Sequence, residues 1–403
     1  MSTPELILKS TIYPLTSSGF YFWTKHVAIP QKIGAEKGVA CFDTIQKDSK
    51  MPRELIAVAP RTPALREYKE PSLNPGEVRI RSIFSAPKHG SELRGYRAET
   101  KDHTSPFEWE RRMHVALNPD EIGVGEGGSP KFPTRLGNMT VGEVIEVSEG
   151  VTRFQIGDRA FGHLPIRETH TAHEDRLEEA PDKMSPKAIV YSDPAGVALS
   201  PVRDAQIGLG DRVAVFGLGA IGQMAVQIAR LQGARWIAAT DPIPVRRELA
   251  KRHGADVVID PLAEDAGLVI KNLTNKIGVD VSLETSGIYG ALNDALRATG
   301  YMGTIVSSAY YTGDARALSL EGEWHRNRLT MISTRDVSQP LPSHPLWDTK
   351  RLHTEAFALL QEGRLSVEGL VYPIVPFNES AEAYRDIDEA PEKSIKLGVV
   401  YET

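Results

Sequence analysis

Short apolar runs alternate with amphipathic stretches over residues 212–334. The runs are rich in β-branched side chains, as strands are, and read RVAVFG, WIAAT, DVVID, VDVSLET, GTIVSS and LTMIST. The stretches between them place apolar residues at helical spacing and cover residues 220–232, 245–253, 263–276, 289–298 and 321–328. Six strands with intervening helices predict an α/β fold with a doubly wound parallel sheet.

The hydrophobic pattern differs on both sides of this region. Upstream, apolar and polar residues alternate in GEVRIRSIFSA, MTVGEVIEVSEG and GDRAFG, with Gly and Pro between these runs. Such alternation predicts antiparallel strands. Downstream, TEAFALLQEGRL predicts an amphipathic helix that ends at Gly363, and LVYPIV and SIKLGVVY predict strands on either side of AEAYRDIDEA. We therefore expect antiparallel strands before the parallel sheet, and a helix and further strands after it.

A glycine motif joins the first predicted strand to the first predicted helix of the parallel sheet. Glycines in a GxGxxG pattern allow a tight turn, let backbone approach a pyrophosphate, and let helix and strand pack closely. The helix N-terminus favours the negative charge of phosphates. We expect a Rossmann dinucleotide site at the six residues Gly217, Leu218, Gly219, Ala220, Ile221 and Gly222.

The charge at the end of the second strand indicates which dinucleotide binds. Asp241 lies 19 residues after Gly222, where an acid accepts a hydrogen bond from a ribose 2′-hydroxyl. A carboxylate there repels the 2′-phosphate of NADP, so we predict NAD. Arg246 and Arg247 follow in the next helix, where we expect them to be solvated cations.

Composition excludes several classes of partner. The 403 residues are 41% hydrophobic and 25% charged, as in globular proteins, and this length predicts two domains. The net charge of −6 does not favour nucleic-acid or anionic-membrane binding. No apolar run reaches the roughly 20 residues that span a bilayer, and the N-terminus does not resemble a signal peptide. With Cys41 as the one cysteine, an internal disulfide is excluded, and we expect a cytoplasmic protein.

The order of these parts resembles the medium-chain dehydrogenase/reductase superfamily, the family of zinc alcohol, sorbitol and threonine dehydrogenases. The resemblance covers residues 51–403 and is carried by LNPGEVRIRSIFSAPKHGSEL, LGNMTVGEVIEVSEGVTRFQIGDRAFG, YSDPAGVALSPVRDAQIGLGDRVAVFGLGAIG, HRNRLTMIST and KSIKLGVVY. It implies a discontinuous GroES-like catalytic domain with a Rossmann domain inserted in it, and a homodimer or homotetramer. The expected divisions are an N-terminal extension (1–50), the first catalytic part (51–192), the Rossmann domain (193–335) and the second catalytic part (336–403).

The residues at the family's metal positions differ from those of the zinc enzymes. The first ligand, a cysteine in the family, corresponds to His89, and the histidine of the family's Gly-His-Glu corresponds to Asn138. The third position, a Glu before Pro in the polyol enzymes, holds Asp193. Zinc prefers thiolate, imidazole and carboxylate ligands, and Met139 also removes a supporting carboxylate. We therefore expect no catalytic zinc, and the segment 95–135 has no cysteine for a structural zinc.

Without a metal, side chains must remove the hydroxyl proton and stabilise the developing oxyanion. His89 is a candidate base or oxyanion donor, and Lys88 is a candidate positive charge, although a solvated lysine is the alternative. Ser91 stands at the family's proton-relay position, with helix capping as its alternative. The other candidates are Glu92 and Asp193, which can orient His89 or bind substrate hydroxyls, and Asn138 as a hydrogen-bonding group. Lys396 matches a position where the family has a cation for the pyrophosphate, with an exposed lysine at a strand end as the alternative.

Three further features leave alternatives open. The loop that replaces the zinc lobe carries Arg94, Tyr96, Arg97 and Trp109, which suit either a pocket for an oxygen-rich substrate or a subunit contact. We interpret His163 and His170 as surface residues. The aromatic N-terminal segment is expected to pack on the body or on a partner subunit.

The function we predict is zinc-independent, NAD-dependent interconversion of an alcohol and a carbonyl, on a small polyol or sugar-like substrate. One alternative is an NADPH-dependent quinone or enoyl reductase, which Asp241 disfavours. Another is an enzyme with tightly bound NAD that oxidises its substrate transiently before elimination or epimerisation. A nucleotide-binding protein without hydride transfer is the non-enzyme alternative.

Overall fold

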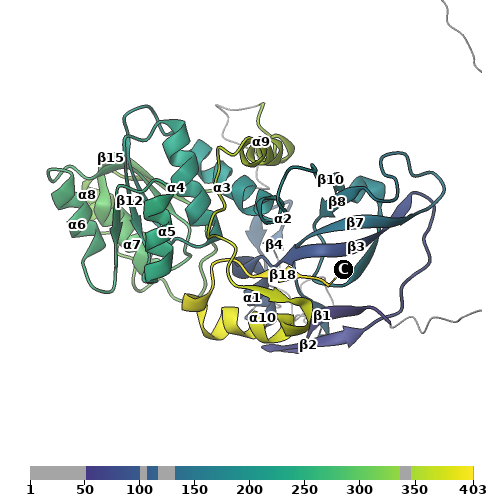
Figure 1. Ribbon diagram of the computed structural model, residues 1–403. Helices are drawn as coiled ribbons and strands as arrows, with labels where there is room; N and C mark the ends of the chain where they lie inside the picture. Colours follow the sequence, from purple (N-terminus) through teal and green to yellow (C-terminus); the bar gives the residue numbers. More distant parts are fainter. Residues whose placement is uncertain (1–50, 100–106, 117–131, 336–345, 403) are drawn as a thin grey trace, which may run out of the picture. The chain divides into compact units, whose positions relative to one another are not determined.

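The computed structural model describes residues 51–99, 107–116, 132–335 and 346–402 (Figure 1). The predicted N-terminal extension lies outside these residues. None of the helices within them is long and apolar enough to cross a membrane.

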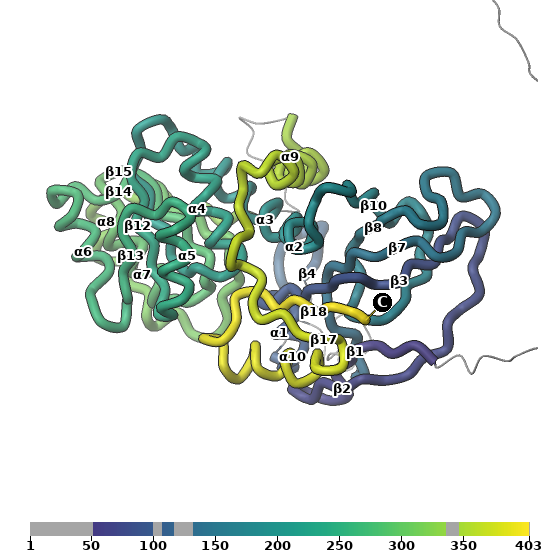
Figure 2. The backbone as a smooth tube through the Cα atoms, in the orientation of Figure 1, coloured from purple at the N-terminus to yellow at the C-terminus, as the bar shows by residue number. Residues whose placement is uncertain are grey.

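A six-stranded parallel sheet forms the nucleotide-binding half (Figure 2). Its strands are β11 (Arg212–Phe216), β12 (Trp236–Thr240), β13 (Val257–Ile259), β14 (Val279–Glu284), β15 (Thr299–Ser307) and β16 (Thr330–Ser333). They lie in the order β13-β12-β11-β14-β15-β16, and every neighbouring pair is parallel. This order, with β11 at the centre, is that of a dinucleotide-binding Rossmann sheet. The six predicted strands are confirmed.

Helices cover both faces of this sheet because alternate strand residues point to opposite sides. Val213 and Val215 of β11 pack in the cluster that includes α4, whereas Ala214 and Phe216 pack with α6 and α7. The helices are α4 (Ala220–Gln232), α5 (Pro244–Arg252), α6 (Ala266–Leu273), α7 (Tyr289–Ala298) and α8 (Glu323–Arg326). The prediction for α6 was too long: the Asp265 side chain caps its N-terminus by accepting from the Leu268 N–H.

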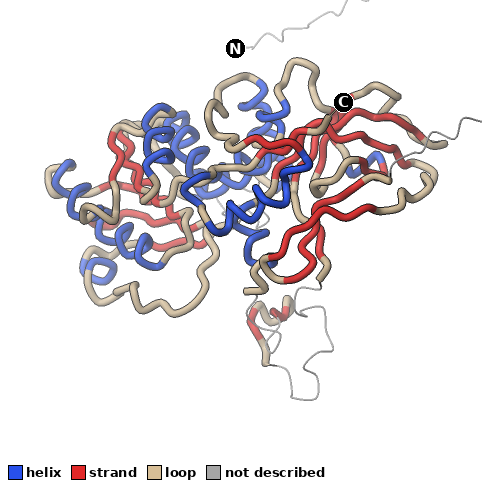
Figure 3. Tube along the Cα trace, turned by 60° about the horizontal axis from the view of Figure 1, so that its bottom comes forward, coloured by secondary structure: helices blue, strands red, loops and turns tan. Residues whose placement is uncertain are grey.

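The antiparallel region contains a seven-stranded sheet (Figure 3). Its strands are β3 (Glu77–Ala86), β7 (Met139–Val147), β8 (Arg159–Gly162), β9 (Thr169–His173), β10 (Glu178–Glu179), β17 (Ile374–Pro376) and β18 (Gly398–Val400). The C-terminal β18 pairs with β3, with Val399 opposite Ser85. The sheet therefore joins two distant parts of the chain, as a discontinuous domain requires.

Within the described residues, the remaining elements are five α-helices and two small sheets. The helices are α1 (His89–Tyr96), α2 (Pro186–Ile189), α3 (Ser192–Asp204), α9 (Thr349–Gln361) and α10 (Ser380–Glu389), and small sheets hold β1 (Arg53–Ala59), β2 (Thr62–Glu67), β6 (Thr134–Arg135), β4 (Phe107–Glu108) and β5 (Met113–His114). After α9 the chain turns at Gly363 (φ +70°), as predicted. The predicted strand LVYPIV is shorter than expected, because Pro373 has no N–H for a ladder and β17 begins at Ile374. The predicted boundary at 192/193 falls at the start of α3 and stays a prediction.

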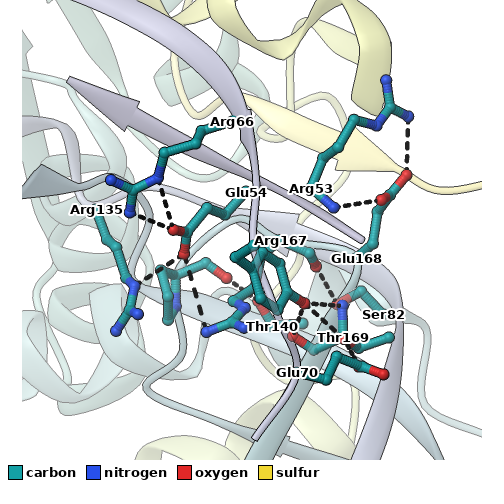
Figure 4. A network of polar contacts seen from close by, with 12 residues as sticks. Arg53, Glu54, Arg66, Glu70, Ser82, Arg135, Thr140, Arg167, Glu168 and Thr169 are labelled. Atoms are coloured by element: carbon teal, nitrogen blue, oxygen red, sulfur yellow. Dashed lines mark hydrogen bonds and ion pairs between the residues drawn. The ribbon is translucent and has the colours of Figure 1, made fainter. Parts of the chain in front are cut away.

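A buried carboxylate joins the three strands of the small β2-β1-β6 sheet (Figure 4). Glu54 on β1 is inaccessible to solvent and accepts hydrogen bonds from Arg66 on β2 and, at 2.9 Å, from Arg135 on β6. Arg167 lies 3.9 Å from the same carboxylate. Burial alone raises the pKa of Glu54, but the guanidinium hydrogen bonds and charges outweigh it and hold the pKa below its ordinary value.

Candidate active site

A cleft of about 650 Å³ brings the glycine motif together with the loop that precedes α1. Gly217 follows β11, Asp241 follows β12 and Thr285 follows β14, so the carboxyl ends of three neighbouring strands meet here. Ligands bind at this edge of doubly wound sheets. The opposite wall comprises Lys88, His89, Leu93, Asp193 and Lys396.

The glycine motif has the geometry that a pyrophosphate requires. Gly217 adopts φ +88°, and a Cβ on Gly222 would lie 1.9 Å from the Gly217 carbonyl oxygen, so neither position accepts a side chain. A Cβ on Gly219 meets no atom within 4 Å, which leaves its backbone open to the cleft. Gly219 is also the N-cap of the thirteen-residue helix α4. These residues fit a dinucleotide phosphate.

The carboxylate of Asp241 is fixed by backbone groups on both of its oxygens. Oδ2 accepts a hydrogen bond of 2.8 Å from the Leu218 N–H, and Oδ1 accepts one of 2.8 Å from the Ile243 N–H. Leu218 itself is buried and does not line the cleft, unlike the rest of the motif. Asp241 therefore links the glycine turn to the end of β12.

The expectation that Arg246 and Arg247 are solvated is wrong. Their side chains are 17% and 16% exposed, because each is drawn inward by acceptors. Arg246 lines the cleft, lies 3.8 Å from Asp241 Oδ2 and donates to the Pro391 and Ser394 carbonyls. Arg247 donates to the Asp241 carbonyl and pairs with Asp260. An arginine thus stands beside the acid that we predict to select the nucleotide.

A cation–carboxylate pair occupies the cleft wall. Lys88 Nζ donates to Asp193 Oδ1 at 2.9 Å, with the Asp193 side chain 3% exposed. The other oxygen of Asp193 is buried without a hydrogen-bond partner among the described residues. Lys88 is therefore an ion-paired residue in the cleft, and a solvated surface cation is excluded.

Lys396 is a second lysine of this wall, and it is 2% exposed. Its ammonium donates to the Pro87 carbonyl at 2.8 Å and lies 5.9 Å from the centre of the Tyr191 ring. Burial lowers the pKa of Lys396 to about 8, although the charges of Asp193 and Glu92 oppose the shift. Its ammonium form therefore predominates at neutral pH and is lost above about pH 8.

The imidazole of His89 is held in one orientation. Its Nε2 accepts a hydrogen bond of 3.1 Å from the Leu397 N–H, which places the ring proton on Nδ1 when the imidazole is neutral. Burial, followed by the charges of Lys396 and Arg246, lowers the pKa of His89 to about 3. His89 is thus a neutral group with one N–H to donate.

Glu92 holds the loop together. One oxygen accepts from the Lys88 N–H at 2.7 Å, and the other accepts at 3.0 Å from the Gly137 N–H and from the Tyr384 hydroxyl. Burial raises the pKa of Glu92 in spite of these bonds. Both oxygens are engaged away from His89, so Glu92 fixes the start of α1 rather than the imidazole.

Two other predicted residues lie outside the residues that line the cleft. Ser91 is exposed in the first turn of α1, which begins at His89, so the alternative that Ser91 only caps a helix beginning at Glu92 is wrong, and its relay role stays a prediction. The Oδ1 atom of Asn138 lies 3.4 Å from Nδ1 of the exposed His163. The Nδ2 atom of Asn138 is buried and has no hydrogen-bond partner among the described residues. The amide of Asn138 is therefore a donor without an acceptor.

Several side-chain expectations are corrected or refined. His170 is buried in β9, not on the surface, because it faces the sheet interior, and its Nε2 lacks a described partner. Tyr96 is a core residue that contacts Tyr384, whereas Trp109 is 65% exposed. Arg97 lines the cleft but is paired with Asp388.

The cleft also contains a segment that the sequence reasoning missed. Thr285, Ser286 and Ile288 line it, and Thr285 Oγ1 donates to the Gly217 carbonyl at 2.8 Å. Their position directly after β14, the strand beside β11, is the signal that identifies them, because both strands end at the same edge.

This fold and cleft define a nucleotide-dependent oxidoreductase with a Rossmann domain and a GroES-like domain. Residues 220–339 match the family model for zinc-binding dehydrogenases, and residues 111–184 match the alcohol dehydrogenase GroES-like domain. D-guloside 3-dehydrogenase of Escherichia coli (strain K12) is 41% identical over 353 residues, which are 87% of this chain and 100% of that protein. The chain belongs to the medium-chain zinc-type dehydrogenase family, whose members are NAD(P)-binding enzymes that interconvert alcohols and carbonyls.

Solved structures share the fold. The 2R,3R-butanediol dehydrogenase from Bacillus subtilis matches with a TM-score of 0.67 and 22% identity, over 87% of this chain and 99% of that one. A zinc-binding dehydrogenase homologue from Sinorhizobium meliloti 1021, bound to NADP, matches with a TM-score of 0.66 and 18% identity, over 87% and 99%.

Proposed function

We propose that this protein is a zinc-independent, NAD-dependent dehydrogenase that oxidises a hydroxyl group of a sugar-like substrate. The observation that carries the proposal is the ion pair between Lys88 and Asp193 in the cleft that also holds the glycine motif. A fixed ammonium supplies the positive charge that a metal otherwise gives to a developing alkoxide.

The donors at the family's metal positions fit zinc poorly. The Nε2 atom of His89 is engaged with the Leu397 N–H, and one oxygen of Asp193 is engaged with the Lys88 ammonium. The second position offers only the neutral amide of Asn138, and a bound Zn²⁺ would lie against the charge of Lys88. No group of three or more His, Cys, Asp and Glu suited to a metal is found among the described residues. We therefore assign the chemistry to side chains.

The choice of NAD rests on Asp241, whose carboxylate is held at the end of β12. The pyrophosphate would lie on the open backbone at Gly219, with Lys396 as its cation. When bound, the nicotinamide ring accepts the hydride from the substrate carbon.

Side chains of the cleft wall stabilise the developing charge, accept the proton and orient the substrate. Lys88 stabilises the negative charge on the substrate oxygen, and the free Oδ2 of Asp193 accepts the hydroxyl proton as the hydride leaves. His89, neutral and with Nδ1 protonated, donates a hydrogen bond to the substrate. The amide of Asn138 and the hydroxyl of Ser91 lie outside the residues that line the cleft, so we assign neither of them a step.

The substrate class is inferred from the similarity to a protein named D-guloside 3-dehydrogenase. A glycoside presents several hydroxyl groups, which suits a wall with one ammonium, one free carboxylate oxygen and one imidazole N–H. We also propose that the protein acts as a homodimer or homotetramer.

The test measures NADH formation with a panel of glycosides, free sugars, polyols and simple alcohols, on protein whose metal content is determined in parallel. We expect turnover of a glycoside or polyol with NAD, unaffected by a chelator. Stoichiometric zinc, or loss of activity on chelation that zinc restores, would refute zinc independence. Activity on simple alcohols alone would refute the substrate class.

A further inference from the structure

Two adjacent tyrosines connect helix α1 to the cofactor side of the cleft. Tyr310 and Tyr311 follow β15, on the nucleotide-binding half. The guanidinium of Arg94 on α1 lies over the Tyr310 ring, 3.8 Å from its centre. Arg94 makes no ion pair among the described residues, and its buried Nε has no hydrogen-bond partner there. The ring face is therefore the main partner of this cation.

Tyr311, the next residue, contacts the buried end of β14. Its hydroxyl donates to Oε2 of Glu284, the last residue of β14, and exchanges a hydrogen bond of 2.9 Å with Ser307. Its ring stacks on Tyr289, with centroids 5.0 Å apart. Glu284 is completely buried, so these contacts are shielded from water.

Glu284 in turn fixes the cofactor-side segment 285–288. Its Oε1 accepts a hydrogen bond of 2.7 Å from the Ser286 N–H, another from the Ser286 hydroxyl, and a third from the Gly287 N–H. Gly287 has φ +75°, and a Cβ there would lie 2.9 Å from the Tyr310 carbonyl oxygen. A Cβ on Gly217 would lie 2.7 Å from the Ser286 Cβ. The segment is thus packed between Tyr310 and the first glycine of the nucleotide motif.

We propose that Arg94 and Glu284 are positioning residues for the nucleotide, acting through Tyr310, Tyr311 and the segment 285–288. This inference rests on the proposed function, because it takes the cleft to hold the dinucleotide. Helix α1 begins at His89 in the cleft wall and carries Arg94 at its far end. The contact of Arg94 with Tyr310 therefore fixes the position of the cleft wall at His89 relative to the segment 285–288.

The first test measures the dissociation constant of NADH by fluorescence, together with KM for NAD and kcat. We expect Arg94→Met and Tyr310→Ala each to weaken NADH binding by about three- to tenfold, the effect of losing a partly exposed cation–π contact. Tyr310→Phe keeps the ring and should bind NADH like the wild type. Arg316→Met, a change of an 89% exposed arginine on the same loop, is the matched control and should have no effect.

The second test asks whether the two residues act along one path. Glu284→Leu should raise KM for NAD with little change in kcat, and Glu284→Gln, which keeps an acceptor for Ser286, should recover most of the affinity. In the Glu284→Leu background, Arg94→Met should add less than about a twofold further loss, because coupled residues are not additive. Thermal unfolding identifies any variant that fails to fold.

The outcomes separate this inference from the proposed function. If the wild type binds no NADH, the proposed function fails first. If the wild type binds NADH and Arg94→Met, Tyr310→Ala and Glu284→Leu all bind it equally well, the positioning role is refuted. Fully additive losses for Arg94 and Glu284 would also refute the shared path.

Discussion

The ammonium of Lys88 lies 2.9 Å from a carboxylate oxygen of Asp193 in the wall of the nucleotide cleft. The two residues are 105 positions apart in the chain, on the loop before α1 and in the first turn of α3. The Asp193 side chain is almost fully buried, whereas Lys88 is 27% exposed toward the cleft. The pair therefore places a cation in the cleft wall, beside a carboxylate whose second oxygen is buried without a hydrogen-bond partner among the described residues.

Replacing Lys88 with methionine tests its role in charge stabilisation. Because an oxyanion partner acts mainly in the transition state, we expect kcat to fall by roughly 10²–10³-fold, with little change in NADH affinity. Lys88→Arg keeps a positive charge and should retain part of the activity. Steady-state kinetics and NADH titration measure both quantities. A kcat within about twofold of the wild type, by the same scale, would contradict the assignment.

His89 is expected to act as a neutral donor. Because burial lowers its pKa to about 3, the imidazole is uncharged throughout the range in which enzymes are usually assayed. His89→Ala should lower kcat/KM by roughly 10²-fold, the effect of losing one donor, and leave the inflections of the pH–rate profile where they are. An acidic limb that vanishes in the variant would show instead that His89 titrates and acts as a base.

The coenzyme preference is expected to depend on Asp241. Asp241→Ser removes the carboxylate that repels a 2′-phosphate. Arg246, which lies 3.8 Å from that carboxylate, remains and can pair with the 2′-phosphate. The ratio of kcat/KM for NADP to that for NAD should rise by about tenfold or more, since one close charge interaction is worth at least ~1.4 kcal/mol there. Asp260→Ser, at the end of the next strand, is the control and should leave the ratio unchanged.

Nucleotide affinity is expected to fall at alkaline pH. Burial lowers the pKa of Lys396 to about 8, so its ammonium, the cation proposed for the pyrophosphate, is lost above that pH. The dissociation constant of NADH should be constant below pH 8 and rise above it. Lys396→Met should bind NADH more weakly at neutral pH and show no such rise. A rise of equal steepness in the variant would exclude Lys396 as its source.

Acid stability is expected to depend on Glu54. The folded state holds the pKa of this carboxyl below its ordinary value, so its contribution is present at neutral pH and is lost as pH falls below about 4.5. Glu54→Gln should lower the free energy of unfolding at neutral pH by about 1–3 kcal/mol. This loss is smaller than that for breaking a fully buried ion pair, because Arg66 and Arg135 are partly exposed.

Urea unfolding across a pH series measures this effect. The variant should lose less stability than the wild type between neutral and acidic pH. Glu143→Gln, which breaks an exposed pair with Arg81, is the control and should cost less than about 1 kcal/mol. An identical pH dependence in wild type and Glu54→Gln would show that the arginine cluster does not shift this carboxyl.

Local pattern was sufficient for most of the fold. The strand–glycine–helix pattern at β11 and α4 predicted both elements and the open backbone at Gly219, because each depends on neighbours in the chain. The wrong predictions concerned where elements end and which side chains are exposed. The short strand at Ile374 reflects the missing N–H of Pro373, and the burial of Arg246 and His170 depends on acceptors and strands far away in the sequence.

The sequence by itself determined that the chain contains a Rossmann dinucleotide site with an acid at its second strand, since glycine spacing and period-two and helical patterns are local. The tertiary structure alone decided how the side chains around the cleft are used. It pairs Lys88 with Asp193, engages Glu92 with Gly137 and Tyr384, and brings Arg94 onto Tyr310. These contacts join residues separated by 45 to 292 positions, and only the packing of whole domains fixes such distances and the burial that sets each residue's charge.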